Sequence, residues 1–466
     1  MMTLQQATQW MAGARLVGDG ALRVLRIHTD TRSVEPGDLF VALKGERYDA
    51  NAFLSEAQVR GAVAVVCHAG LGTSHLPAGL PRIEVQDTKA ALQALATAWR
   101  TQFDLPVIAV TGSNGKTTVT QMLASILDAQ CPDDTFLATR GNLNNDIGVP
   151  LTLLRLRASH RMAVVELGMN HPGEIAVLAG MAQPTVALVN NAQREHLEFM
   201  QTVRAVAAEN GSVIAALGAH GVAVIPEDDE FTALWQDLAS PRRVVRFALD
   251  AHAADDVLTC AQAQWSHGGW RVLAQGLGVT LNYRLGIAGR YNVKNSLAAA
   301  ACALAAGATP QAVELGLQNF VPVKGRSRAM EIAVQGSQRT VIDDTYNANP
   351  DSVRAAIDVL ADLPGPRMLV LGDMGEVGHE GPAFHAEAGR YAHARGIEQL
   401  LAMGELTCST TDVFPGAHHF DSVEDLNAAV LAGMPHVGSV LVKGSRFMRM
   451  ERVVESVVAH FSNGEH

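Results

Sequence analysis

Closely spaced cysteines are absent from this chain. Its five cysteines, Cys67, Cys131, Cys260, Cys302 and Cys408, lie far apart and form no C-x-x-C pair. This distribution argues against a disulfide framework and against a structural zinc site. It favours a reducing compartment, so we expect a cytoplasmic protein.

Long apolar runs and an excess of basic residues are also missing. The most apolar run, LAAAACALAAGA at 297–308, is too short to span a bilayer, and the first residues lack the basic and apolar regions of a signal peptide. We therefore expect no membrane insertion. The formal net charge is −11, which argues against a nucleic-acid partner and requires any phosphate site to be local.

The composition is that of a large globular protein. Hydrophobic residues make up 48% of the chain and charged residues 18%, which excludes disorder. A length of 466 residues predicts about three domains. We place their boundaries near residues 86 and 325, which gives domains at 1–85, 86–325 and 326–466.

Short apolar runs alternate with segments of helical period along most of the chain. This rhythm predicts parallel sheets with crossover helices, and hence an α/β fold. Strands are expected in DLFVAL, GAVAVVCH, PVIAV, MAVVELG, TVALVNN and GVAVIP, and later in RTVIDDT, RMLVLGD, QLLAMG and SVLVKGS. Between Val257 and Ile287, glycine-punctuated segments predict antiparallel strands, followed by an alanine-rich helix after Asn292. A further helix should open at Asn349-Pro350, where Asn can cap and Pro suits the first turn.

The segment TGSNGKTT has the features of a phosphate-binding loop. It lies between a strand pattern and a helix pattern, so backbone N–H groups and the positive end of a helix face one point. Lys116 can reach the outer phosphates of a nucleotide, and the Thr117 hydroxyl can bind Mg²⁺. The spacing departs from G-x-x-x-x-G-K-[ST] because Val110 takes the place of the first glycine, and a glycine turn with a surface lysine is the weaker alternative. We predict ATP binding by Thr111, Gly112, Ser113, Asn114, Gly115, Lys116, Thr117 and Thr118.

Two residues beyond neighbouring strands are candidates for holding Mg²⁺ near this loop. Glu166 ends MAVVELG, and His196 follows TVALVNN. Ligands gather beyond the carboxyl ends of parallel strands, so both side chains should face the phosphates together with Thr117. Taken singly, Glu166 could equally be a solvated strand end and His196 a packing histidine. With Lys116, they are the candidate catalytic residues.

These motifs resemble the ATP-dependent Mur ligases of peptidoglycan synthesis over essentially the whole chain. TGSNGKTT is similar to that family's shortened phosphate loop, and Glu166 and His196 match its metal-binding positions. YNANP and GNLNN resemble signatures of the member that adds D-alanyl-D-alanine to UDP-N-acetylmuramoyl-tripeptide. The motifs that carry the resemblance are DTRSVEPGDLFVALKG at 30–45, TRGNLNNDIGVPLTLL at 139–154, ELGMNHPGEI at 166–175, DDTYNANPDS at 343–352, LGDMGEVG at 371–378 and KGSR at 443–446.

The resemblance implies a three-domain architecture and a two-step reaction. The N-terminal domain would hold the UDP-sugar, the central domain ATP and Mg²⁺, and a C-terminal Rossmann-like domain the dipeptide. The peptide carboxylate would attack the γ-phosphate to give ADP and an acyl phosphate, and the incoming amine would then form the amide. The family also suggests a monomer. The sequence leaves open whether the third residue of the tripeptide is meso-diaminopimelate or lysine.

The resemblance also implies individual roles. The residues that match nucleotide-contacting positions are Asn292, Asn295, Arg326 and Asp344. Those that match substrate positions are Asp30, Thr31, Arg32, Lys44, Asp49, Asn51, Asn142, Asn144, Asn145, Tyr346, Asn347, Asn349, His385, Lys443, Ser445 and Arg446. Several of these residues could instead have ordinary structural roles. GNLNND could be a polar turn, Asn292 or Asn349 a plain helix cap, and the basic residues at 324–328 a solvated linker.

Two positions depart from the family pattern. Asn210 stands where members often carry a carbamoylated lysine, and Tyr291 where the adenine motif usually has histidine. Because of Asn210, a nucleotide-binding protein with weakened catalysis stays an alternative to the ligase. A sister Mur ligase or a folylpolyglutamate synthase-like enzyme is the other alternative, although such enzymes should lack YNANP and GNLNN.

Overall fold

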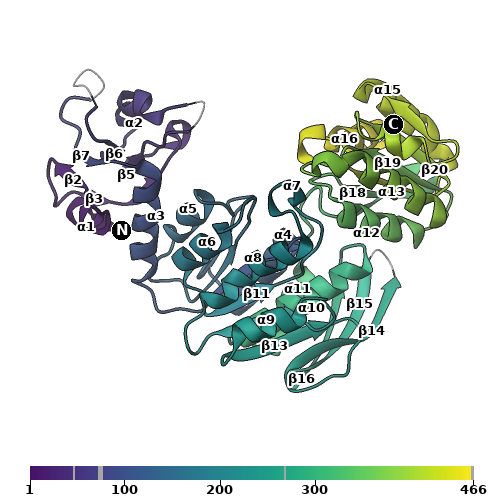
Figure 1. Cartoon of the computed structure of the whole chain (residues 1–466), viewed down its shortest axis with the longest axis horizontal. Helices are drawn as coiled ribbons and strands as arrows, with labels where there is room; N and C mark the ends of the chain where they lie inside the picture. The colour runs from purple at the N-terminus through teal and green to yellow at the C-terminus, as the bar shows by residue number, and fades with distance from the viewer. Residues whose placement is uncertain (46–47, 72–76, 267–268, 463–466) are drawn as a thin grey trace.

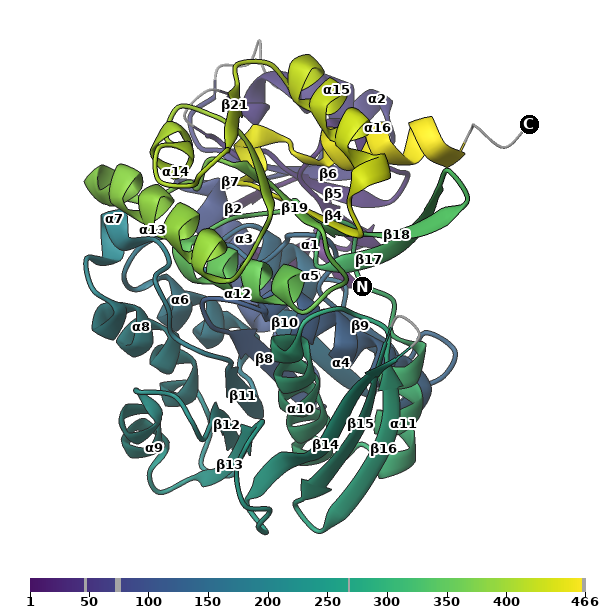
Figure 2. The ribbon, with the colours of Figure 1, turned by 90° about the vertical axis from the view of Figure 1, so that its right-hand side faces the viewer.

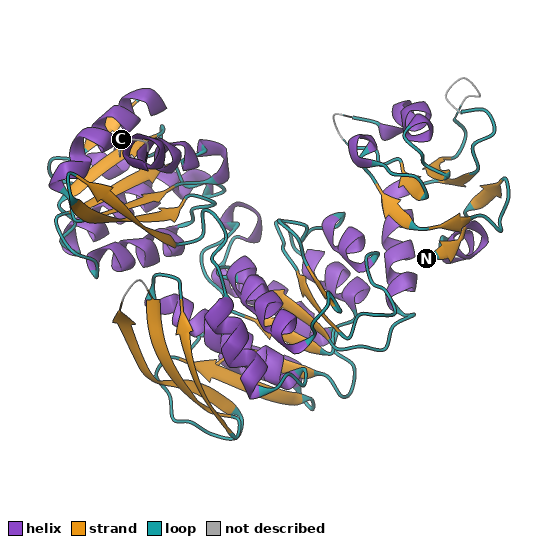
Figure 3. Ribbon diagram, turned by 180° about the vertical axis from the view of Figure 1, so that it is seen from behind, coloured by secondary structure: helices purple, strands orange, loops and turns teal. Residues whose placement is uncertain are grey.

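The computed structural model describes residues 1–45, 48–71, 77–266 and 269–462, and within them the chain forms three α/β units (Figure 1). The N-terminal, central and C-terminal units contain a five-, a nine- and a six-stranded sheet, respectively. The first and last units stand at opposite ends of the central one (Figures 1 and 3). The predicted α/β class with three units is confirmed.

The N-terminal sheet has the strand order β2-β7-β6-β5-β4. The strands predicted in DLFVAL and GAVAVVCH are β5 (Asp38–Val41) and β6 (Ala64–His68), which lie side by side in parallel. The other elements of this unit are β1 (Met2–Thr3), α1 (Leu4–Trp10), β2 (Arg15–Val17), β3 (Arg23–Val24), β4 (Arg26–His28), the 3-10 helices η1 (Thr31–Ser33) and η2 (Ala50–Phe53), α2 (Leu54–Val59) and β7 (Arg82–Val85).

Helix α3 (Thr88–Arg100) joins the N-terminal unit to the central one. Asp87 caps its start by accepting bonds from two backbone N–H groups. At its end, the Trp99 indole donates to Leu156 O at 3.1 Å, and Arg100 Nε donates to Ala182 O at 2.9 Å. One apolar cluster therefore continues from the N-terminal sheet through α3 into the central unit.

The central sheet has the order β16-β15-β14-β13-β12-β11-β8-β10-β9. Its first six strands along the chain pair in parallel, and β14 joins β13 in parallel as well. Strands β14, β15 and β16 pair antiparallel with one another, as predicted for Val257 to Ile287. The bounds are β8 (Val107–Thr111), β9 (Phe136–Ala138), β10 (Met162–Glu166), β11 (Val186–Val189), β12 (Val222–Pro226), β13 (Arg243–Ala248), β14 (Val257–Ser266), β15 (Gly269–Gly276) and β16 (Val279–Leu285).

Helices cover both faces of this sheet because its central strands are apolar on both sides. In β10, Ala163 and Val165 pack into the cluster shared with α6 and α8, whereas Met162 and Val164 pack into the cluster of α4, α10 and α11. Figure 2 shows α6 and α8 on one side of the strands and α10 and α11 on the other. The helices are α4 (Lys116–Gln130), α5 (Gly148–Leu153), α6 (Glu174–Ala182), α7 (Leu197–Met200), α8 (Val203–Ala215), α9 (Thr232–Ala239), α10 (Arg290–Ala305) and α11 (Pro310–Asn319).

The C-terminal sheet has the order β17-β18-β22-β19-β20-β21, and all four strands predicted for this unit are present. Strand β17 was not predicted: it pairs antiparallel with β18 and begins at Arg328, the end of the basic run. The elements are β17 (Arg328–Val334), β18 (Ser337–Asp344), α12 (Pro350–Ala361), β19 (Arg367–Gly372), η4 (Gly378–Glu380), α13 (Gly381–Ala394), β20 (Gln399–Met403), α14 (Cys408–Thr411), β21 (His418–Phe420), α15 (Val423–Gly433), η5 (Met434–His436), β22 (Ser439–Lys443), η6 (Arg446–Met448) and α16 (Glu451–Ser462).

Two predicted helix starts have different outcomes. Asn349 caps α12 as predicted, with a reciprocal bond to Ser352. The alanine-rich helix α10 instead begins two residues before Asn292, and Gly289 is its cap residue. The interpretation of Asn292 as an N-cap is therefore wrong, because its side chain lies inside the first turn and donates to Ala288 O at 2.7 Å.

None of the described helices is both long enough and apolar enough to cross a membrane.

Candidate active site

The segment TGSNGKTT forms the predicted strand, turn and helix start. Strand β8 ends at Thr111, and α4 begins at Lys116. Gly112 and Gly115 have φ angles of +132° and +84°, which favour glycine. A Cβ atom on Gly115 would also lie 2.6 Å from Asn190 Nδ2, so a side chain does not fit there. The loop thus depends on both glycines.

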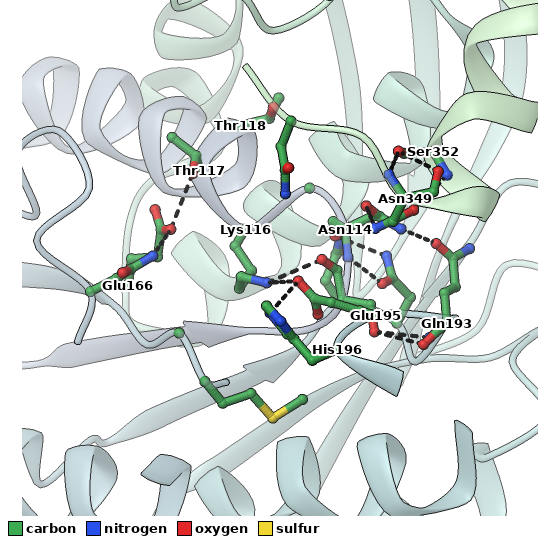
Figure 4. A pocket seen from close by; sticks show the side chains of 18 of the residues that line it. Asn114, Lys116, Thr117, Thr118, Glu166, Gln193, Glu195, His196, Asn349 and Ser352 are labelled. Carbon is green, nitrogen blue, oxygen red and sulfur yellow. Dashed lines mark hydrogen bonds and ion pairs between the residues drawn. The ribbon is translucent and has the colours of Figure 1, made fainter. Parts of the chain in front are cut away.

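Lys116 is held over this loop. Its ammonium donates to Gly112 O at 2.6 Å, to Ser113 O at 3.1 Å and to Glu195 Oε1 at 3.0 Å (Figure 4). The side chain is largely buried. The loop N–H groups and the N-terminus of α4 create positive potential at the same point as the Lys116 ammonium. Such an arrangement favours the binding of phosphate groups.

A cavity of about 980 Å³ surrounds the loop and receives side chains from the central and C-terminal units and from α3. Most of the predicted site residues line it, although they come from distant parts of the sequence. They are Ser113, Asn114, Gly115, Lys116, Thr117, Thr118, Asn144, Asn145, Glu166, His196, Asn292, Asn295, Arg326, Asp344, Tyr346, Asn347, Asn349 and Lys443. A site of this size can hold a nucleotide and part of a second substrate.

Glu166 and Thr117 fit a metal ion. Glu166 Oε1 accepts from Thr117 Oγ1 at 3.1 Å and from Asn144 Nδ2 at 2.8 Å, while Oε2 is buried without a hydrogen-bond partner (Figure 4). A buried carboxylate oxygen that lacks a partner is costly. Mg²⁺ favours carboxylate, hydroxyl and phosphate oxygens, so this pair suits it once a nucleotide supplies the phosphates.

His196 lines the same cavity, but its ring is held by two other carboxylates. Nε2 lies 3.5 Å from Glu195 Oε1, and Nδ1 lies 2.5 Å from Glu376 Oε2 of the C-terminal unit. Burial works to lower the pKa of His196, yet the bonds to Glu195 and Glu376 outweigh it and raise the pKa to about 9. With this pKa, the ring is a cation at neutral pH. The Thr117 hydroxyl donates its hydrogen bond to Glu166 and not to His196.

Glu195 is a residue that sequence reasoning missed. Burial works to raise its pKa, but Lys116 and His196 outweigh burial and keep the pKa below the usual value. Its carboxylate thus lies between two cations, with Oε2 buried and without a partner. The available signal was its position next to His196 in NAQREHLEF, directly beyond a strand that ends at the site.

Buried amides connect α10 to the phosphate loop. Asn295 Oδ1 accepts from Asn190 Nδ2 at 3.0 Å, and Asn295 Nδ2 donates to Asn292 Oδ1 at 2.8 Å. Asn190 Nδ2 also donates to Asn114 O at 2.8 Å. Close by, the Tyr291 hydroxyl lies 2.6 Å from Ser327 Oγ, so the ring at this unusual position is tied to the start of the C-terminal unit.

The C-terminal unit contributes directly to the nucleotide cavity. Asn349 Nδ2 donates to Asn114 Oδ1 at 3.0 Å, so Asn349 caps α12 and also touches the loop (Figure 4). Arg326 Nη2 lies 3.4 Å from Thr117 Oγ1, and its guanidinium stacks on Tyr346 at 4.0 Å. The basic run is therefore not merely a solvated linker, although Lys324 within it is exposed and pairs with Glu455.

Asp344 and Lys443 form a buried pair at the carboxyl ends of β18 and β22. Lys443 Nζ donates to Asp344 Oδ2 at 2.6 Å and to Asn347 O at 2.8 Å. The pair fixes the backbone that carries the YNANP signature at the cavity wall.

Arg194 joins the central unit to the C-terminal one. Its guanidinium lies 2.7 Å from Asp351 Oδ1 and 2.9 Å from Glu387 Oε2, and it faces the Phe384 ring. Arg354 also binds Glu387, at 3.2 Å. These contacts hold α12 and α13 beside the loop that carries Glu195 and His196.

Asn210 does not present a charge to the cavity. It is buried in α8, and its Oδ1 accepts from Thr111 Oγ1 at 2.7 Å and from Gly112 N at 3.1 Å. Its neighbour Glu209 accepts from Gly173 N and Ile175 N, both at 2.8 Å, at the start of α6. Consecutive residues of α8 thus fix two loops of the site.

We expect Asn210→Ala to weaken ATP binding about tenfold. The change leaves two buried donors at the start of the loop without an acceptor, so the loop is held less firmly in its phosphate-binding shape. A tenfold weaker affinity corresponds to a loss of about 1.4 kcal/mol. Titration of a non-hydrolysable ATP analogue would measure the effect. Ser212→Ala on the same helix, which removes only a bond to Ala208 O, is the matched control. Equal affinities for the two variants would contradict the role of Asn210.

The predicted UDP-sugar residues lie on the N-terminal unit, outside the cavity. Asp30 caps η1, which contains Thr31, and hydrogen bonds from the Arg32 guanidinium lower its pKa to about 2. Asn51 Nδ2 donates to Asp49 Oδ1 at 2.6 Å, and Lys44 pairs with Asp49 through a backbone bridge. The structure groups these residues in two turns, and their contact with substrate stays a prediction.

Four other predicted substrate residues do not line the cavity, and neither do Thr111 and Gly112 at the start of the loop. His385 is fully buried in α13 and accepts from Met374 N at 2.9 Å, which fits a packing role. Asn142 is exposed in the turn before α5. Ser445 Oγ accepts from Gly375 N, and Arg446 is exposed and pairs with Glu451. Beyond Lys443, the chain forms only the single turn η6 before α16 begins.

Three family models match the chain along its length. They are described as "Mur ligase family, catalytic domain" at residues 23–100, "Mur ligase middle domain" at residues 110–303 and "Mur ligase, glutamate ligase domain" at residues 325–446. The third match begins at residue 325, whereas residue 86 lies inside the first match, and both boundaries expected from the sequence stay a prediction.

Full-length relatives and solved structures agree with these matches. The UDP-N-acetylmuramoyl-tripeptide–D-alanyl-D-alanine ligase of Escherichia coli is 40% identical over 98% of each chain. A MurF crystal structure from Acinetobacter baumannii has a TM-score of 0.88 at 33% identity and covers 98% of this chain and 99% of its own. A UDP-N-acetylmuramoylalanyl-D-glutamyl-2,6-diaminopimelate–D-alanyl-D-alanyl ligase from the same organism has a TM-score of 0.85 at 32% identity and covers 98% of both chains. The chain belongs to the Mur ligase family.

Proposed function

We propose that this protein is an ATP-dependent ligase that joins D-alanyl-D-alanine to UDP-N-acetylmuramoyl-tripeptide. The products are UDP-N-acetylmuramoyl-pentapeptide, ADP and phosphate, in the synthesis of peptidoglycan precursors. The observation that carries the proposal is the contact of Asn349 with Asn114, which brings the YNANP signature onto the phosphate loop in one cavity.

The chain's own residues meet the electrostatic demand of the first step. The tripeptide carboxylate must approach a highly charged nucleotide, so the two anions repel each other. Lys116, the loop N–H groups and Arg326 place positive charge around the phosphates and stabilise the charge that develops during transfer. Thr117 and Glu166 would hold Mg²⁺, which adds charge neutralisation when bound.

The second step needs the dipeptide beside the acyl phosphate. We assign dipeptide binding to Tyr346, Asn347 and Asn349 because they line the cavity from the C-terminal unit. Asn144 and Asn145 would contact the tripeptide from the opposite side. The proposed domains are 1–85 for the UDP-sugar, 86–325 for ATP and 326–466 for the dipeptide.

Phosphate release with each substrate left out in turn tests the function. Incubation with ATP, Mg²⁺, UDP-N-acetylmuramoyl-tripeptide and D-alanyl-D-alanine should release phosphate and form the pentapeptide only when both acceptors are present. Release without either acceptor would indicate a plain ATPase, and no release a nucleotide binder. Product formed with a single amino acid in place of the dipeptide would indicate a sister ligase.

We further propose that the enzyme is a cytoplasmic monomer. This proposal rests on the resemblance to the Mur ligase family, which suggests a monomer. Light scattering coupled to size-exclusion chromatography would measure the mass in solution. A dimer mass would contradict the monomer.

A further inference from the structure

One wall of the cavity carries two opposite charges for which the proposed reaction has no use. Lys89 lies in the first turn of α3, and Asp146 lies just before α5. Lys89 Nζ is 2.8 Å from Asp146 Oδ2, and both residues line the cavity. Their side chains are 50% and 41% exposed, so a ligand in the cavity can reach both charges.

The backbone under both side chains is fixed. Asp87 accepts from Lys89 N at 2.8 Å and thereby caps α3. Gln93 Nε2 donates to Asp146 O at 3.0 Å, and Asn145 Oδ1 accepts from Gly148 N at 2.8 Å at the start of α5. The two charges are therefore presented from rigid helix starts rather than from a loose loop.

The pair is not required for stability. Exposed ion pairs contribute about 0–1 kcal/mol, because each charge is well solvated when it is apart from its partner. Either group can consequently exchange its partner for a ligand group at little cost. Glu174, another acidic side chain that lines the cavity, is already engaged, since Oε2 accepts from Asn170 N and His171 N.

The pair lies within reach of the tripeptide's third residue. Asp146 follows Asn144 by two residues, a span of about 7 Å at most. Asn144 contacts Glu166, which contacts Thr117 at the phosphate loop. The carboxylate to be phosphorylated belongs to the third residue and must lie at this loop. The long side chain of a diamino acid starts at the same α-carbon and can extend along the wall.

We propose that Lys89 and Asp146 form the subsite for the far end of that side chain and favour a zwitterionic end. This inference rests on the proposed function. Diaminopimelate ends in an ammonium and a carboxylate, which match Asp146 and Lys89, respectively. Lysine ends in an ammonium alone, so it would leave Lys89 without an anionic partner and place two cations side by side.

The test compares two nucleotides, UDP-N-acetylmuramoyl-tripeptide with meso-diaminopimelate and with L-lysine at the third position. Wild-type kcat/KM should be higher for the first. Lys89→Met should lower kcat/KM about 10- to 100-fold for the diaminopimelate form and much less for the lysine form, because one charged hydrogen bond is lost only in the former. Asp146→Asn should lower both values. Binding of each nucleotide without ATP should show the same pattern.

Arg395→Met is the matched control. It breaks the ion pair between Arg395 and Asp358, which lie 2.8 Å apart and whose side chains are about as exposed as those of Lys89 and Asp146. Neither Arg395 nor Asp358 lines the cavity. Its ratio of kcat/KM values should equal that of the wild type. An equal loss with both nucleotides in Lys89→Met, or no loss with either, would overturn the subsite. A wild type that turns over neither nucleotide would instead overturn the proposed function, and the subsite with it.

Discussion

Lys116→Ala should reduce kcat by about 1,000-fold or more while the protein stays folded. The ammonium is the cation that the loop itself holds over the phosphate site, and its loss leaves the repulsion between carboxylate and nucleotide uncompensated. The fold should survive because the partners of Lys116 are two loop carbonyls and Glu195, and alanine suits the first turn of α4. Phosphate release in a single turnover, together with circular dichroism, would measure both effects.

Lys324→Ala is the matched control for this prediction. Lys324 also belongs to the basic segment near the cavity, but it is exposed and pairs with Glu455. It should retain nearly full activity. If Lys116→Ala also kept near-normal turnover, the assignment of TGSNGKTT as the catalytic phosphate loop would be wrong.

Glu166→Gln should lower kcat about 100- to 1,000-fold and raise the Mg²⁺ concentration needed for half-maximal rate. Glutamine has the same shape, and its amide oxygen can still accept from Asn144 and Thr117, so the change removes mainly the charge. The buried oxygen that lacks a partner, Glu166 Oε2, is the group whose charge a divalent ion would use.

Two measurements separate a metal ligand from a residue that only supports the fold. Rates over a range of Mg²⁺ concentrations should show partial recovery of Glu166→Gln at high Mg²⁺. Binding of Mn²⁺ in the presence of ADP, followed by electron paramagnetic resonance, should weaken in parallel. An unchanged metal dependence with a lower thermal midpoint would point to a structural role and contradict the assignment.

The parts of the site that the sequence predicted are those with local signals. The phosphate loop could be predicted because its parts are adjacent in the chain: the strand PVIAV, the two glycines and the start of α4. Their order and spacing are enough to indicate it. Asn349-Pro350 was recognisable for the same reason, since a cap and a first-turn proline act within one helix turn. The main α/β alternation followed from apolar runs bounded by glycine and proline.

The parts that were missed depend on contacts between distant segments. Asn114 and Asn349 are 235 positions apart, and Arg194 and Glu387 are 193 apart. No periodicity reveals which residues such contacts join. Asn292 was misjudged because its partner, Ala288 O, lies before the helix that the alanine run indicated. His385 matched a family position but is buried against backbone, which only packing shows.

The two joints of the chain differ in chemistry, and this difference has a mechanical consequence. Apolar side chains of the N-terminal unit, of α3 and of the central unit form one continuous cluster. Separating the two units would therefore expose apolar surface to water. Around Arg194 and Asn349, by contrast, the joint consists largely of charged and amide groups that regain hydration on parting. Three residues of the central unit, Trp265, Ala288 and Tyr291, also pack against the C-terminal core. We therefore expect the C-terminal unit to rotate away from the central unit when substrates enter and products leave. The N-terminal and central units should move together as one rigid body.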